Sequence, residues 1–217
     1  AKSGSERAPH RGMLPAGFSA EHFGPNDHYF WDNFWSIAGM EEAVWMARIT
    51  DRRSDADRIE DEVADFRADL ESAMAWAIER GQGALPSSPY RRVDAASIGN
   101  LVALSPLAVV PSDAAWLEPT MAHLSRECVR DGLFFQSIVH TGLNPYLSVQ
   151  LARARLATGD DKGCLEILRA LARVASPTWC WPEAIHPRTG GGCMGDGDHG
   201  WAAAEFVSLL RDMLVRE

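Results

Sequence analysis

The sequence predicts an all-α fold, and three observations lead to this prediction. Apolar residues recur every three or four positions along most of the chain. Glycine, proline and acidic residues separate these segments, mostly at short connections. No stretch shows the alternation of apolar and polar residues that is typical of a strand. With 217 residues the chain is long enough to bury a core, so we expect one domain of about seven helices in helical hairpins.

The first two helices are predicted from their apolar faces. The face of the first consists of Trp31, Phe34, Trp35, Ala38, Trp45 and Ile49. The face of the second consists of Ile59, Val63, Phe66, Leu70, Met74 and Ile78. Aspartate, glutamate and arginine cover the other side of the second helix, which is the pattern of an amphipathic helix packed on a core.

The later helices are placed by their start and stop signals. A third helix is expected from Asp94 to about Leu104, because Pro106 stops it. Three more are expected near 113–130, 144–158 and 161–175, and "TGDD" between the last two indicates a C-cap glycine followed by an acidic helix start. The apolar residues of the final helix are Trp201, Phe206, Leu209, Leu210, Met213 and Leu214.

Composition excludes several classes of function. The formal net charge is −9 and the isoelectric point is about 5.3, which argues against a nucleic-acid or anionic-membrane surface. No apolar run reaches the roughly 18–20 residues that a membrane span needs. The four scattered cysteines, Cys128, Cys164, Cys180 and Cys193, fit a reducing compartment better than a disulfide scaffold, so we expect a cytoplasmic protein.

The first twelve residues, "AKSGSERAPHRG", form neither a signal peptide nor a packed element. We therefore expect residues 1–12 to be flexible. We also expect the chain, taken as a single domain over 1–217, to be the C-terminal part of a longer protein.

Two segments carry candidate functional residues, and eight tryptophans suggest aromatic platforms for sugar rings. In "GPNDHYFWDNFW" one acid can be explained as a helix cap. Asp32 is harder to explain this way, because a carboxylate inside an aromatic run is costly unless it lines a polar pocket. Such an acid can accept hydrogen bonds from sugar hydroxyls.

The second segment is "TWCWPEAIHPRTGGGCMGDGDHGWAAAEF", from Thr178 to Phe206. Trp179 and Trp181 can shield Glu183 from water, which suits this carboxyl to proton transfer. The glycines at 190–192 allow the backbone to approach a ligand closely. The alternative is a surface loop on which Glu183 pairs with Arg188.

A metal site in the same segment is the less favoured interpretation. Its possible ligands are Cys180, His186, Cys193, His199, Asp196 and Asp198. Their spacing matches no compact zinc site, and "DGD" supplies too few ligands for a calcium loop. We therefore predict neither a metal nor an organic cofactor.

Three motifs resemble the trehalase-type (α/α)6 toroid glycosidases, whose relatives include glucosidase I and mannosylglycerate hydrolase. "HYFWDNFWSIAGM" resembles an early element whose Trp-Asp pair contacts the sugar, which implies this role for Trp31 and Asp32, with Asn33 beside them. "TGLNPYLSVQLARA" resembles a later helix whose start faces the active site, which implies that Asn144 and Tyr146 lie at its mouth.

The third motif, "PEAIHPRTGGG...HGWAAAEFVSLL", is similar to the end of the glucosidase I and mannosylglycerate hydrolase branch. The resemblance implies that Glu183 is the general base of an inverting hydrolase. It also implies that His199 and Trp201 open the last helix on the active-site side. Trp31, Trp35, Trp181 and Trp201 are then expected to form the apolar walls of a sugar pocket.

The chain also departs from this family, because it offers fewer helices than a complete toroid and lacks the family's general-acid motif. Asp94 is the nearest candidate acid, although a helix cap explains it as well. The expected function is hydrolysis of an α-glucosidase or trehalase type. The alternatives are a non-catalytic carbohydrate-binding or scaffolding domain and a plain helical interaction domain. Expected partners are a carbohydrate and either the rest of a longer parent chain or a second copy.

Overall fold

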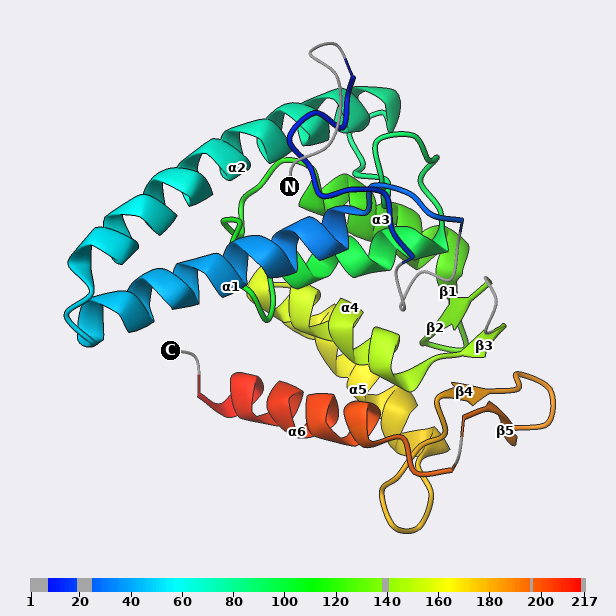
Figure 1. The fold of residues 1–217 in the computed structure, drawn as a ribbon. Helices are drawn as coiled ribbons and strands as arrows, with labels where there is room; N and C mark the ends of the chain where they lie inside the picture. Colours follow the sequence, from blue (N-terminus) through cyan, green and yellow to red (C-terminus); the bar gives the residue numbers. More distant parts are fainter. Residues whose placement is uncertain (1–7, 19–24, 138–140, 196, 216–217) are drawn as a thin grey trace.

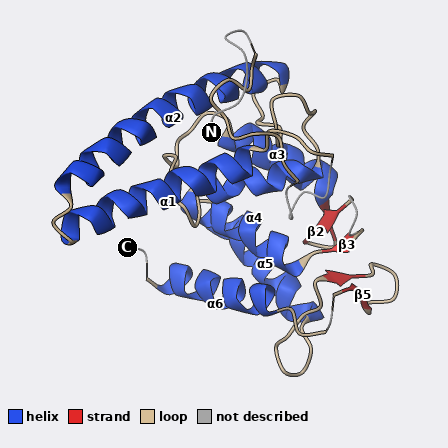
Figure 2. Cartoon of the chain, viewed as in Figure 1, coloured by secondary structure: helices blue, strands red, loops and turns tan. Residues whose placement is uncertain are grey.

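The computed structural model describes residues 8–18, 25–137, 141–195 and 197–215. Most of this part is helical, with a small sheet at one end (Figure 2). The helices are α1 (Phe30–Ile49), α2 (Arg53–Arg80), α3 (Leu117–Cys128), α4 (Pro145–Ala157), α5 (Asp161–Val174), α6 (Gly200–Leu214) and the 3₁₀ helix η1 (Ala95–Ala103). The helical segments expected from the sequence are therefore confirmed, although the third is a 3₁₀ helix.

The helices form two layers (Figure 1). In the inner layer α1, η1, α4 and α6 contact one another in that order. In the outer layer α2 packs on α1, α3 on η1 and α5 on α4. Among the described residues, the extensive inner-layer contacts of α1 are with η1 and those of α6 are with α4, which places these two helices at the ends of the layer.

The expectation of a chain without strands is wrong. The strands β1 (Val129–Arg130), β2 (Leu133–Gln136), β3 (Gly142–Leu143), β4 (Ala184–Ile185) and β5 (Gly192–Met194) form one antiparallel sheet in the order β1-β2-β3-β4-β5. None exceeds four residues, so alternation is too short to be visible in the sequence. Leu143 pairs with Ile185, which joins the start of α4 to the segment before α6.

Helix α1 is apolar on two sides. The buried side consists of Phe30, Asn33, Phe34, Ile37, Val44 and Ala47. Most of the face predicted to pack on the core is instead partly or fully exposed, with Trp45 at 58% and Ile49 at 62%. The spacing of apolar residues correctly predicts a helix here. Because the helix has two apolar faces, however, tertiary packing decides which of them is buried.

The connection between α2 and η1 is buried along much of its length. Residues 84–89 are all buried. Leu85 N–H donates to Thr120 Oγ1 at 2.9 Å, and the Asn100 amide donates to the Leu85 and Pro86 carbonyls at 2.9 Å each. These side chains satisfy backbone groups that would otherwise be buried without partners.

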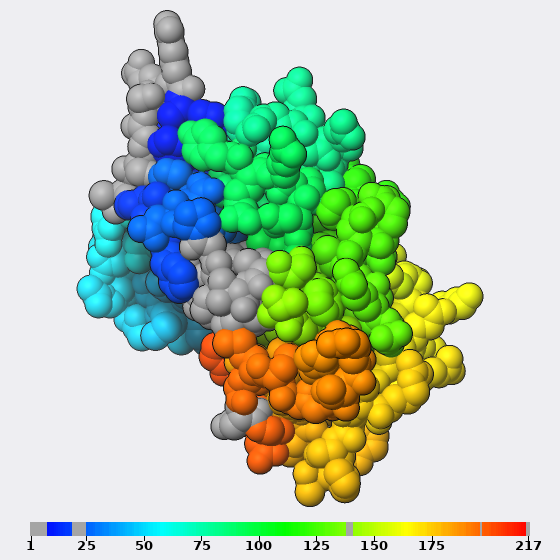
Figure 3. All heavy atoms as spheres, turned by 90° about the vertical axis from the view of Figure 1, so that its right-hand side faces the viewer, coloured from blue at the N-terminus to red at the C-terminus, as the bar shows by residue number. Residues whose placement is uncertain are grey.

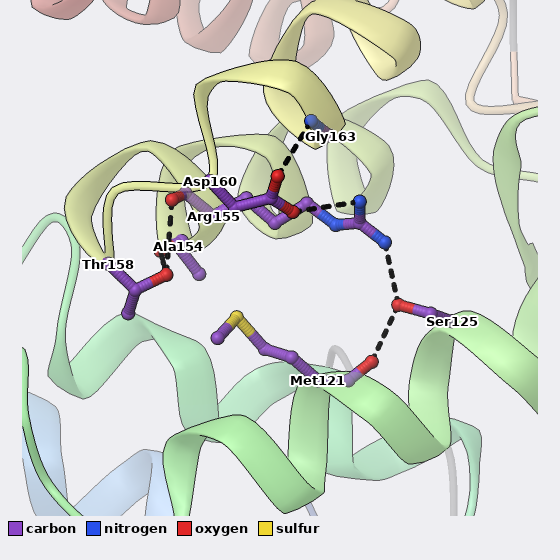
Figure 4. A network of polar contacts seen from close by, with 7 residues as sticks. All are labelled: Met121, Ser125, Ala154, Arg155, Thr158, Asp160 and Gly163. Carbon is purple, nitrogen blue, oxygen red and sulfur yellow. Dashed lines mark hydrogen bonds and ion pairs between the residues drawn. The ribbon is translucent and has the colours of Figure 1, made fainter.

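A polar network joins α3 to the turn between α4 and α5 (Figure 4). Asp160 caps α5, since its Oδ1 accepts from Gly163 N at 2.9 Å, and its Oδ2 pairs with Arg155 at 3.2 Å. Arg155 also donates to Ser125 Oγ on α3 at 2.8 Å. A Cβ at Gly163 would lie 2.0 Å from Arg155 Nη1, so glycine is required for this arrangement.

Part of the N-terminal segment lies among the described residues. Residues 1–7 of the stretch expected to be flexible lie outside the described residues. Residues 8–12 are described, and they include a turn closed by Arg11 N–H donating to the Ala8 carbonyl at 2.9 Å. Met13, directly after them, is fully buried. No helix in the described part is long and apolar enough to cross a membrane.

We predict that Asp160→Ala lowers the free energy of unfolding by about 1 to 2 kcal/mol, because it removes the α5 cap and the partner of Arg155. Chemical denaturation measures the change. Asp57→Ala, at an exposed position of α2, is the matched control and should stay within about 0.5 kcal/mol of the parent. Equal effects of the two substitutions would contradict the capping role.

Candidate functional site

A cavity of about 340 Å³ lies between the inner helices. α1 contributes Trp31 and Trp35, and the starts of α4 and α6 contribute Tyr146 and Trp201. The remaining lining residues are Val102, Ser105, Pro106, Gln150, Arg153, Ala204 and Glu205. The cavity thus joins aromatic residues from three segments that lie far apart in the sequence, and each of these segments contains candidate site residues predicted from the sequence.

On the α1 side, Trp31 and Trp35 stand one helical turn apart. Their ring centroids are 5.8 Å apart in an edge-to-face arrangement. Trp35 is 41% exposed while Trp31 is partly buried. Both predicted tryptophans therefore present apolar surface to the cavity.

Asp32 lies between these tryptophans in the first turn of α1. It is partly buried, and within the described part of the chain no hydrogen bond or ion pair engages its carboxylate. Burial raises the pKa of Asp32 from its usual 3.8 to about 6. Asp32 does not itself line the cavity. The helix therefore holds, next to two cavity tryptophans, a carboxyl that changes charge in mildly acidic solution.

Asn33 has a structural role and lies away from the cavity. Its side chain is fully buried, where Oδ1 accepts from Leu14 N at 3.0 Å and Nδ2 donates to the Tyr29 carbonyl at 2.6 Å. These bonds attach the N-terminal segment to the start of α1. The predicted contact of Asn33 with a sugar is corrected, because both ends of its amide are engaged inside the protein.

The other side of the cavity is a cluster of three rings. Tyr146 lies 6.3 Å from His199 and 5.9 Å from Trp201, and His199 lies 5.8 Å from Trp201, measured between ring centroids. The backbone N–H of His199 donates to the backbone carbonyl of Trp181 at 2.7 Å. The starts of α4 and α6 therefore meet beside the loop that carries Glu183.

Glu183 directly precedes β4 and is partly exposed. The side chain packs on Gly195, where an added Cβ would lie 2.8 Å from Glu183 Cβ and 3.0 Å from Oε2. Gly195 also has a φ of +65°, which favours glycine. Gly195, which was not predicted from the sequence, therefore leaves the room that the Glu183 side chain occupies. Like Asp32, Glu183 lies outside the cavity lining.

Trp181 is corrected from a pocket wall to a core residue. It is 1% exposed, its indole N–H donates to the Leu171 carbonyl at 3.1 Å, and its ring lies 4.9 Å from that of Phe206. Trp179 is 56% exposed instead of shielding the loop.

In Figure 3 the segment around 185–195, in orange, borders the yellow-green residues near the start of α4, as the pairing of Leu143 with Ile185 requires.

Asn144 and Asp94 are both helix caps. Asn144 is buried, accepts from Leu147 N at 2.9 Å and donates to Gln136 Oε1 at 3.0 Å. Asp94 accepts from Ala96 N at 2.9 Å and pairs with Arg91 at 2.7 Å. The structure thus gives Asp94 the capping role that the sequence offered as an alternative, and its carboxylate is bonded to Ala96 and Arg91.

The polar side of the cavity was not predicted from the sequence. Arg153 on α4 is largely buried and pairs with Glu205 at 2.7 Å and with Asp212 at 2.9 Å, both on α6. Gln150 is buried, and its Nε2 has no hydrogen-bond partner among the described residues. A signal for these residues was present in "LSVQLARARL". This helix is buried on nearly all sides, so its polar residues are unusual and indicate a polar site.

The possible metal ligands of the segment from Thr178 to Phe206 were also compared with the structure. Within the described ranges, no group of three or more histidine, cysteine or acidic residues could hold a metal ion. Asp196 lies outside those ranges. All four cysteines are free thiols.

Comparisons with known proteins give one kind of match. No family model matches the chain, and no curated protein matches its sequence. Three solved structures superpose well: a glycosidase variant with a TM-score of 0.71, a wild-type glycosidase with 0.67, and a glycosidase variant in complex with glucose, also with 0.67. Each is 18% identical to this chain.

The matches cover 92%, 87% and 87% of this chain but only 55%, 52% and 52% of the respective glycosidases. The chain thus spans about half the length of the solved structures that it matches. At this identity the likeness concerns the fold, so the chain has a helical, glycosidase-like fold.

We predict that Asp32→Asn stabilises the chain by about 1 kcal/mol at pH 7.5, a value reduced by the partial exposure of the carboxyl. Since folding raises this pKa, the ionised form destabilises the native state above pH 6. The advantage of the variant should therefore shrink as the pH falls from about 6 to about 4. Denaturation at several pH values measures it, and Asp57→Asn controls for removing one negative charge.

Proposed function

We propose that the chain is a glycoside hydrolase-like domain that binds a carbohydrate in the cavity between α1, α4 and α6. The observation that carries this proposal is the cavity itself, where Trp31 and Trp35 oppose Tyr146 and Trp201 in a glycosidase-like fold. Aromatic walls suit the apolar faces of sugar rings. A volume of about 340 Å³ lies within the range of small-molecule sites.

The polar groups around the cavity suit sugar hydroxyls. The Nε2 group of buried Gln150 gains a partner when a hydroxyl oxygen accepts its hydrogen bond. Ionised Asp32, beside Trp31 and Trp35 but outside the cavity lining, can accept hydrogen bonds from hydroxyls that extend beyond the cavity. The pair of Arg153 with Glu205 fixes the polar end of the cavity. One glycosidase with the same fold was solved in complex with glucose, and this supports a hexose as the ligand.

In the hydrolytic form of the proposal, the substrate extends from the cavity to Glu183, which lies outside the cavity lining and deprotonates the attacking water. An inverting mechanism needs a second carboxyl about 6.5–9.5 Å from the base to protonate the leaving oxygen. Gly195 acts as a positioning residue, because it leaves room for the Glu183 side chain. The expected substrate is an α-linked glucoside, as the resemblance to trehalase-type enzymes implies.

A second candidate is a carbohydrate-binding domain without hydrolytic activity. The observation that favours it is the engagement of Asp94 in its cap and in its pair with Arg91. With Asp94 occupied, the nearest acid candidate from the sequence is lost. The two candidates share the cavity and differ only in the presence of a competent acid.

We predict that Glu183→Gln lowers the hydrolysis of an α-linked glucose disaccharide at least about a hundredfold and changes its affinity less than about threefold. Proton NMR of the first product anomer follows both rate and stereochemistry, and calorimetry follows binding. Full activity in the variant would refute the base assignment. Binding without turnover by the parent chain would select the second candidate.

For Gln150→Leu we predict opposite effects on stability and on binding. Removing an unsatisfied buried amide should leave the free energy of unfolding unchanged or higher. Glucose affinity should fall about five- to tenfold, because a hydroxyl loses its donor. Denaturation and calorimetry measure the two quantities. A variant that binds glucose as the parent does would exclude Gln150 from the site.

A further inference from the structure

The end helices of the inner layer carry apolar faces that nothing in the described part of the chain covers. On α1, Trp35, Trp45, Met46 and Ile49 are 41–62% exposed and share one side of the helix by their spacing. On α6, Val207, Leu210 and Leu214 are 37–84% exposed and lie on the side away from the core. Large contiguous apolar patches are rare on monomeric proteins and typically mark interaction sites.

Of the two exposed faces, the one on α1 gives the stronger indication of a binding partner. This helix is apolar around most of its circumference, because the core buries Phe34 and Ile37 on the opposite side. A helix that is apolar all round is typically buried all round. Trp35 belongs both to this face and to the cavity lining, so whatever covers the face also borders the cavity.

The two faces are complementary in charge. Glu42 is exposed within the apolar stripe of α1, seven residues from both Trp35 and Ile49. Arg211 is exposed on α6 between Leu210 and Leu214. Pairing the α1 face with another α1 face would oppose like charges, whereas pairing it with an α6 face opposes opposite charges.

We propose that these faces bind a second copy of the chain, with the α1 face of each copy on the α6 face of the other. Because the two faces lie at opposite ends of one inner layer, a twofold axis generates two equal contacts and closes the assembly (Figure 1). The part of this chain that superposes covers only 52–55% of the solved glycosidases, and a second copy can occupy the place of the helices beyond that part. The cavity then lies inside the closed assembly.

Sedimentation equilibrium of the 217-residue chain without sugar tests the proposal. The expected mass is twice 23.8 kDa at micromolar concentration. Trp45→Glu with Ile49→Glu should yield a monomer with unchanged helical circular dichroism. Leu165→Glu, at an exposed apolar position on the outer helix α5, is the matched control and should remain a dimer.

Charge reversal tests the pairing of α1 with α6. Glu42→Arg alone should weaken the dimer about tenfold, and Glu42→Arg combined with Arg211→Glu should restore it. A monomeric parent chain, or a dimer that none of the α1 changes affects, would overturn the proposal. Sugar binding is measured separately by calorimetry, so failure of the dimer leaves the carbohydrate proposal standing.

Discussion

The burial of Trp181 is the constraint on which the rest of the site depends. Its indole N–H is bonded to α5, its ring packs on Phe206 of α6, and its carbonyl accepts from His199 at the start of α6. One core side chain thus fixes α6 and the loop that carries Glu183 relative to each other. A large aromatic residue is suited to this role, because its buried area is large and its polar atom finds a partner.

The same arrangement decides which residues reach the cavity. Strand pairing between Leu143 and Ile185 brings the loop to the start of α4, where Tyr146 meets His199 and Trp201. The other wall comes from α1, whose extensive contact within the inner layer is with η1. The shape of the cavity therefore depends on the positions of α1 and α6, the two end helices of the inner layer.

Helix α1 has two apolar faces with different roles. One apolar face holds the domain together through the core, and the other is open beside the cavity. Asp32 lies at the boundary between them, where it is buried enough for a raised pKa but not paired within the described part. A helix with such a division is stable in the fold and still offers surface to a ligand and a partner.

The sequence by itself determined the helices, because spacing of apolar residues and caps such as Asp160 act within a few residues. It also indicated Trp31, Trp35, Tyr146 and Trp201, since aromatic residues at helix starts are visible locally. Only tertiary structure decided that Trp181 and Asn33 are internal and that Gln150 and Arg153 line the cavity. Which face of a helix is covered depends on partners far away in the chain, and no local pattern contains that information.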